Sequence, residues 1–170
     1  AGKLSRKVAG VDTDISLPVS FVARLDTIKT GWAYYPMGSA PVFVWNPSLS
    51  IKAPRPEGTD KDNKPLYKEC FGVELFSKAI GGVVDFTSSS MLVRDAMNAL
   101  YTEYEPLAAA GQVPVVELTG TKKEVGKHGT NYAPIFKIVK MVPVPAEFSN
   151  PSAANQSVVA PTPQKAVSEF

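Results

Sequence analysis

The chain has 170 residues, with 18 Lys and Arg against 16 Asp and Glu, so its formal net charge is only +2 at pH 7. This length fits one domain of ordinary size with appended segments, and the near-balanced charge excludes a polycation. With one cysteine and one histidine, the chain has neither an internal disulfide nor the residues for a structural zinc site. No apolar run approaches the roughly 20 residues of a membrane-spanning helix, and no signal peptide is recognisable. We therefore expect a cytoplasmic protein without a membrane partner, metal or cofactor.

Changes in composition divide the chain into three parts. Residues 1–16 contain Lys3, Arg6 and Lys7 and predict a basic N-terminal arm. Residues 17–148 carry the periodic apolar patterns of one folded domain. Residues 149–170 are rich in Pro, Ala, Ser, Gln and Val without a helical or strand period, which predicts a disordered tail.

The first half of the domain shows strand patterns. Residues 17–25 alternate apolar and polar side chains, and 42–45 form a short apolar run that Asn46-Pro47 ends. Residues 53–65 concentrate turn formers and charges and predict a mobile loop. Residues 67–76 resume the alternation, and 83–86 could extend this third strand into a hairpin after Gly81-Gly82.

The second half predicts one helix and a hairpin. Three serines precede Met91, and apolar residues then recur at helical spacing until Pro106. Residues 113–118 and 135–142 are apolar and β-branched, so they should pair as strands. Between them, residues 119–131 hold three glycines, three lysines and the histidine, and we expect a basic loop. The order favours a mainly β protein: a five-stranded Greek-key barrel of the OB type with one helix between strands 3 and 4.

The search for catalytic residues gives no set with a recognisable chemistry. His128 lies between lysine and glycine in the expected basic loop, where it is a poor general base. Asp12 with Asp14, and Asp60 with Asp62, are spaced like solvated turn residues rather than metal ligands. The stretch from Gly120 to His128 lacks the glycine spacing and the terminal Ser or Thr of a phosphate loop. We expect a protein that is not an enzyme.

The remaining pattern is a basic loop beside aromatic strands. Binding of single strands needs cations for the phosphates and flat side chains for the bases. Candidate phosphate contacts in the basic loop are Lys122, Lys123 and Lys127. Candidate stacking residues are Trp32, Tyr34, Trp45 and Tyr132. Arg55, Lys64 and Lys68 could extend the basic track.

The chain resembles phage-type single-stranded DNA-binding proteins with an OB fold. The resemblance rests on the order of strands and helix over 17–148, on the glycine-lysine loop and on the run from Asn131 to Ile138. It implies coating of single-stranded DNA, with little sequence preference, in replication or recombination, in the host cytoplasm if the protein is viral. The terminal Glu169-Phe170 resembles tails that recruit replication proteins, although the usual acidic tract is missing.

Other interpretations remain open at this level. A viral assembly protein would use the same β-barrel for protein contacts, and a carbohydrate-binding barrel would stack Trp45 and Tyr35 on sugar rings. Residues 42–45 could pair across a two-fold axis as an edge strand of a homodimer. RNA and duplex DNA are not distinguished from single-stranded DNA by the sequence.

Overall fold

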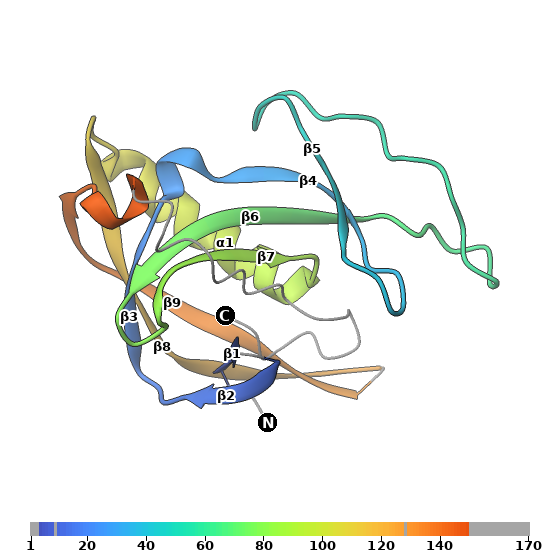
Figure 1. Cartoon of the computed structure of the whole chain (residues 1–170), viewed down its shortest axis with the longest axis horizontal. Helices are drawn as coiled ribbons and strands as arrows, with labels where there is room; N and C mark the ends of the chain where they lie inside the picture. Colours follow the sequence, from blue (N-terminus) through green and yellow to red (C-terminus); the bar gives the residue numbers. More distant parts are fainter. Residues whose placement is uncertain (1–3, 9, 128, 150–170) are drawn as a thin grey trace.

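The computed structural model describes residues 4–8, 10–127 and 129–149 of the chain. Its strands and helix are β1 (Leu4–Val8), β2 (Val11–Ile15), β3 (Val19–Ala23), β4 (Lys29–Tyr34), β5 (Val42–Trp45), β6 (Lys68–Ser77), β7 (Gly82–Ser88), α1 (Met91–Tyr104), β8 (Gln112–Gly126) and β9 (Gly129–Pro143) (Figure 1). Three short 3-10 helices, at Leu25–Thr27, Glu105–Leu107 and Ala146–Ser149, complete the described elements. Among these residues no helix is long and apolar enough to cross a membrane.

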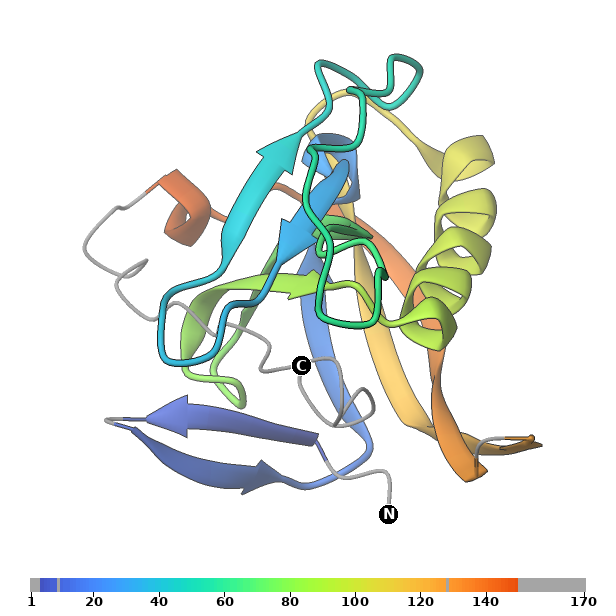
Figure 2. The ribbon, with the colours of Figure 1, turned by 90° about the vertical axis from the view of Figure 1, so that its right-hand side faces the viewer.

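One antiparallel sheet forms the body of the protein. Its strands follow the order β5-β4-β6-β3-β8-β9, and β7 pairs with β6. The short helix at Leu25–Thr27 separates β3 from β4, and both strands pair with β6. Within the described residues no pairing joins β7 to β9, so the expected closed barrel is not observed. Instead α1 follows β7 and packs against β9, so the helix connects the two strands where backbone pairing would close the sheet (Figure 2).

The prediction of a mainly β protein with one α-helix is confirmed, but the strand assignments change. β6 and α1 lie where their patterns predicted them. β4 was not predicted, and β7 is a full strand that precedes the helix. The expected basic loop over 119–131 is wrong: β8 continues to Gly126 and β9 begins at Gly129.

The predictions for the two ends of the chain can be compared with the structure almost only at the N-terminal end. The expected basic arm over 1–16 contains a β-hairpin, in which β1 and β2 pair from Leu4 with Ile15 to Val8 with Val11. This hairpin forms a sheet of its own. The predicted tail, 149–170, lies outside the described residues except for Ser149.

The core lies between one face of the sheet and α1. Alternation on β6 directs Phe71, Val73 and Leu75 inward, and the helical period of α1 supplies the facing side chains. The facing residues are Val93, Met97, Leu100 and Tyr104. Each fully buried apolar side chain of this size stabilises the fold by roughly 1.5–3 kcal/mol. The helix begins after Ser90, whose backbone N–H donates to Ser88 Oγ at 3.2 Å, while the Ser90 side chain makes no capping hydrogen bond.

Residue 31 must be glycine for β4 and β5 to approach. A Cβ at Gly31 would lie 2.3 Å from the carbonyl oxygen of Val44 and 2.9 Å from Cα of Trp45. Both contacts are with backbone, so no rotation of a side chain relieves them. A Cβ added at Gly120, on β8, would have open space around it.

We expect Gly31→Ala to destabilise the protein by about 1–3 kcal/mol, because it forces β5 away from β4. The free energy of unfolding in urea measures this loss. Gly120→Ala is the matched control and should change it by less than about 0.5 kcal/mol. Equal unfolding free energies for the two variants would contradict the close approach of β4 and β5.

Candidate nucleic-acid interface

On the face of the sheet away from the core, residues that pair between neighbouring strands form rows across β5, β4, β6 and β7. Because Phe71, Val73 and Leu75 of β6 point into the core, the residues between them point to the outer face. The rows are Phe43–Ala33–Lys68, Trp45–Gly31–Cys70 and Lys29–Gly72–Thr87. Their central positions are small, which leaves a shallow floor over which larger side chains of neighbouring strands can lie.

Three aromatic side chains, which we call the aromatic row, cover this floor: Tyr35, Phe43 and Trp45. The Phe43 and Trp45 rings are stacked with centroids 5.1 Å apart and an interplanar angle of 8°. Tyr35 meets Phe43 edge to face at 6.2 Å. The edge of the Trp45 ring approaches Gly72 so closely that a Cβ there would lie 2.9 Å from its Cη2 atom. Gly72 therefore allows Trp45 to reach over β6.

Lys29 covers the ring of Trp45. Its Nζ lies 4.3 Å from the ring centroid, and its side chain is exposed. An exposed cation–π contact contributes about 0.5–1 kcal/mol, whereas a base stacked on an aromatic side chain contributes about 1–3 kcal/mol. The contact with Lys29 is therefore weaker than the stacking of a base on the same ring.

The floor itself carries no charge at neutral pH. Burial raises the pKa of the Cys70 thiol to about 12 and also raises the pKa of the Tyr35 phenol. The Tyr35 hydroxyl approaches Ser89 and Thr87 but has no hydrogen bond of good geometry among the described residues. Positive charge comes from exposed Lys29 and Lys68 at the ends of the rows.

The expected phosphate contacts lie on the β8–β9 hairpin. Lys122, Lys123 and Lys127 are exposed. Lys122 Nζ lies 2.9 Å from Glu124 Oε1, so part of its charge is neutralised. Lys123 pairs with Tyr132, which places a cation beside a half-buried aromatic ring on the same side of the hairpin.

Trp32, one of the four candidate stacking residues, is buried. Its side chain is only 4% exposed, and its Nε1 donates to the carbonyl oxygen of Ala53 at 2.8 Å. Lys52 Nζ and Arg55 Cζ lie 5.0 and 4.7 Å from the ring centroid. Trp32 lies on the side of β4 opposite Trp45. The loop after β5 (residues 46–67) encloses its indole, so Trp32 anchors this loop.

The other predicted residues are divided between the two faces. Tyr34 is half-buried, and the centroids of the Tyr34 and Tyr67 rings are 5.5 Å apart. Tyr34 lies on the same side of β4 as Trp32, opposite Trp45. Arg55 and Lys64 are exposed on the loop between β5 and β6, and the backbone N–H of Lys64 donates to Asp60 Oδ1 at 2.9 Å. Lys68 lies on the outer face with the aromatic row.

Two hairpins extend from the same end of the molecule, β4–β5 with the aromatic row and β8–β9 with the lysines (Figure 1). Seen from that end they stand on opposite sides (Figure 2). Lys29 and Phe43 belong to this surface and were not predicted, and Tyr35 was considered only as a residue that stacks on sugar rings. The alternation of Val42 to Trp45 was the available signal, because it puts Phe43 on the same face as Trp45.

The loop after β5 is held by an ion-pair network. Glu69 accepts hydrogen bonds from Lys52 and from Arg94, so strand β6 joins the loop to α1. The hydrogen bond from Lys52, with the charge of Arg94, lowers the pKa of Glu69. The carboxylate is therefore ionised at neutral pH and keeps Lys52 beside Trp32.

Comparison with known proteins gave no family model, no curated protein and no solved structure that matches this chain. In the part of the chain that the structure describes, no three His, Cys, Asp or Glu side chains are grouped so that they could hold a metal ion.

Acid should release the loop after β5. Because the pKa of Glu69 is lowered on folding, its stabilising contribution is present above its ordinary value of 4.5 and is lost as the pH falls through the lower folded value. In Trp45→Phe, Trp32 is the remaining tryptophan, and its fluorescence should be constant above pH 4.5 and change below it.

Glu69→Gln in the same background is the control. At neutral pH the Trp32 fluorescence of this variant should already equal that of Trp45→Phe in acid. It should then stay constant as the pH falls, until the whole protein unfolds. A transition of unchanged midpoint in Glu69→Gln would contradict the role given to this carboxylate.

Proposed function

We propose that this protein binds single-stranded DNA with little sequence preference, through base stacking and phosphate contacts, and protects it in replication or recombination. The aromatic row carries the proposal: stacked rings lie on a floor of small residues with exposed Lys29 and Lys68 at its ends. Each base stacked there is worth about 1–3 kcal/mol, and all four bases have a π-face.

The strand connections support an OB-type arrangement. We take β3 and β4 together as strand 1, β6 as strand 2, β7 as strand 3, and β8 and β9 as strands 4 and 5, with α1 between strands 3 and 4. OB folds are partly open Greek-key barrels that bind single strands on strands 2 and 3 and on the 1–2 and 4–5 loops. In this assignment Phe43 and Trp45 lie in the 1–2 connection, and Lys122, Lys123 and Lys127 lie in the 4–5 hairpin.

Titration of labelled oligo-dT, matched duplex and oligo-U, followed by fluorescence anisotropy at low and moderate salt, tests the proposal. We expect salt-sensitive binding that favours single strands, because neutralised phosphates release counterions. Oligo-U shows whether RNA is also bound. Affinity that does not change with salt would contradict the phosphate contacts.

Substitutions separate the two parts of the interface. Trp45→Ala should weaken binding of oligo-dT by about 5- to 150-fold, which corresponds to about 1–3 kcal/mol of stacking. Lys122→Gln combined with Lys123→Gln should lower the slope of log K against log salt by about 1.4, or about 0.7 for each phosphate contact.

Lys78→Gln is the matched charge control, because Lys78 is exposed in the β6–β7 turn, outside both hairpins. It should change neither the affinity nor the salt slope measurably. A change in salt slope of about 0.7 in Lys78→Gln, half that of the double variant, would show that only net charge matters and would argue against a defined interface.

A protein-contact function, as in a viral assembly protein, is the second candidate. The observation that favours it is on β9, at one end of the strand order, where Ile135 and Val139 are 44% and 52% exposed. Exposed apolar side chains on an edge strand are suited to pairing with another chain. This function predicts ordered oligomers and no salt-sensitive binding of oligo-dT.

A further inference from the structure

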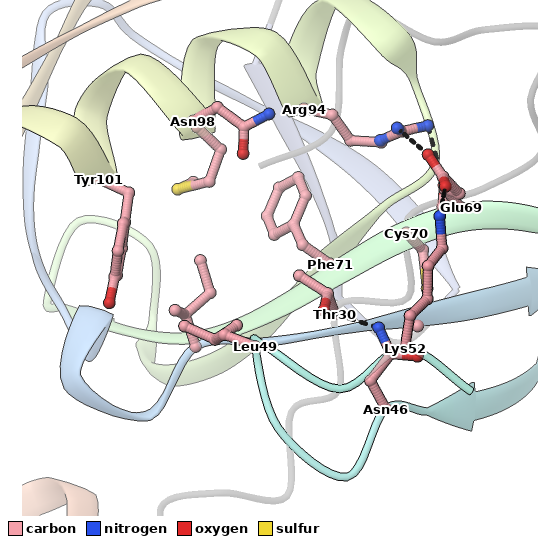
Figure 3. A pocket seen from close by; sticks show the side chains of 13 residues that line it. Thr30, Asn46, Leu49, Lys52, Glu69, Cys70, Phe71, Arg94, Asn98 and Tyr101 are labelled. Atoms are coloured by element: carbon pink, nitrogen blue, oxygen red, sulfur yellow. Dashed lines mark hydrogen bonds and ion pairs between the residues drawn. The ribbon is translucent and has the colours of Figure 1, made fainter.

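A pocket lies on the other side of β4 from the aromatic row, between α1 and the loop after β5 (Figure 3). Its volume is about 360 Å³. Pockets that bind small ligands have volumes of roughly 300–1,000 Å³, so this one can hold a ligand of modest size. Nothing in the proposed coating of single strands uses it.

The wall formed by the loop is fixed without a ligand. The Asn46 backbone N–H donates to the Thr30 carbonyl at 2.8 Å, and Asn46 Nδ2 donates to Thr30 Oγ1 at 2.9 Å. Asn46 Oδ1 accepts from the Ala53 backbone N–H at 2.9 Å. The side chain of Asn46 therefore joins the loop to β4 at Thr30 and ties the two parts of the loop together at Ala53. A preformed wall lowers the cost of ordering when a ligand binds.

The interior of the pocket is apolar and partly aromatic. Phe71 and Met97 are 4% and 3% exposed and form its floor. Tyr101, one turn further along α1, stands at one side with its ring toward the pocket, and Leu49 faces it from the loop (Figure 3). Flat ring systems suit such a space, because they contact aromatic and thioether groups over a large area.

The rim adds polar groups of two kinds. The Asn98 side-chain amide makes no hydrogen bond with the described residues, and it offers a donor and an acceptor side by side. That pair is complementary to the edge of adenine. Lys52 and Arg94 share the single carboxylate of Glu69, so this part of the rim keeps an excess of one positive charge.

We propose that this pocket binds one adenine nucleotide. The base lies on Phe71 and Met97 with its edge on the Asn98 amide, and the phosphate lies at Lys52 and Arg94. A free mononucleotide and an adenine nucleotide within a bound strand share this chemistry. Gly31 and Cys70 also line the pocket, but Thr30, Glu69 and Phe71 point away from the outer face, so the pocket lies on the side of β4 opposite the aromatic row.

Methionine-methyl NMR of the full chain tests the proposal, with dAMP, adenosine, inorganic phosphate and oligo-dA as probes. The Met97 methyl group reports on the pocket, and Met37, which is 96% exposed on the β4–β5 turn, is the internal control. We expect dAMP to shift the Met97 signal saturably and to leave Met37 unchanged. Adenosine should act more weakly, and phosphate alone should not shift Met97.

Two variants sharpen the test. Asn98→Leu should weaken binding of dAMP about tenfold, as expected for the loss of a bidentate contact to a base. Ala99→Leu is the matched control, because the neighbouring residue is exposed and does not line the pocket. Lys52→Met should weaken binding of dAMP more than binding of adenosine, because it removes a phosphate contact in addition to the loop's bond to Glu69.

The outcomes separate the sources of the nucleotide and the two proposals. A Met97 shift with dAMP but not oligo-dA supports a site for free nucleotides, and a shift with both supports a site that also accepts a nucleotide of a strand. Failure of oligo-dT to bind would overturn the coating function, yet a saturable shift with dAMP would still support this pocket. No Met97 shift with dAMP, or the same shift with phosphate alone, would overturn the pocket proposal.

Discussion

The absence of side chains at Gly31 and Gly72 is the constraint on which the outer face of this protein depends. At Gly31 a Cβ would collide with the backbone of β5, so glycine sets how closely the two strands approach. At Gly72 a Cβ would collide with Trp45, so glycine lets that ring lie over the neighbouring strand. The two glycines thus convert an ordinary sheet surface into a floor for aromatic side chains.

Strand β4 separates two environments because its side chains alternate. Lys29 and Gly31 face the aromatic row, whereas Thr30 and Trp32 face the loop after β5. Buried Trp32 binds that loop through Ala53, and Thr30 binds it through Asn46. A single short strand therefore positions the proposed stacking surface on one side and a preformed pocket on the other.

Charge acts locally in this protein, because the net charge of +2 is too small to attract a polyanion by itself. The lysines of the β8–β9 hairpin are exposed and project from the sheet, where solvent screening limits each one to short-range contact with a phosphate. In contrast, Lys52 and Arg94 share the carboxylate of Glu69 and hold the loop. Exposed lysines thus serve the proposed interface, whereas these paired cations maintain the loop and carry the one excess positive charge at the rim of the pocket.

Periodicity alone determined the mainly β class, β6 with its core face, and α1, because a long segment with one buried face repeats its pattern many times. The strand β4 was not predictable in this way, since its glycine has no side chain to contribute to a pattern and is explained only by the approach of β5. Trp32 and Tyr34 are two residues apart on β4 and so share a face, but the sequence could not show which face is covered. That depended on the loop after β5, which buries Trp32 and leaves Phe43 and Trp45 on the other side.

The lysines of residues 119–131 were correctly recognised as a basic segment, but only the tertiary structure showed that they lie on strand β8 and the turn of a long hairpin. Composition reports charge and turn formers, whereas strand pairing depends on backbone partners that lie far apart in the chain. The pocket was invisible to the sequence for the same reason: Asn46, Glu69 and Arg94 come from three separate segments. Sequence determined which kinds of side chain are present, and tertiary contacts decided which of them are exposed together.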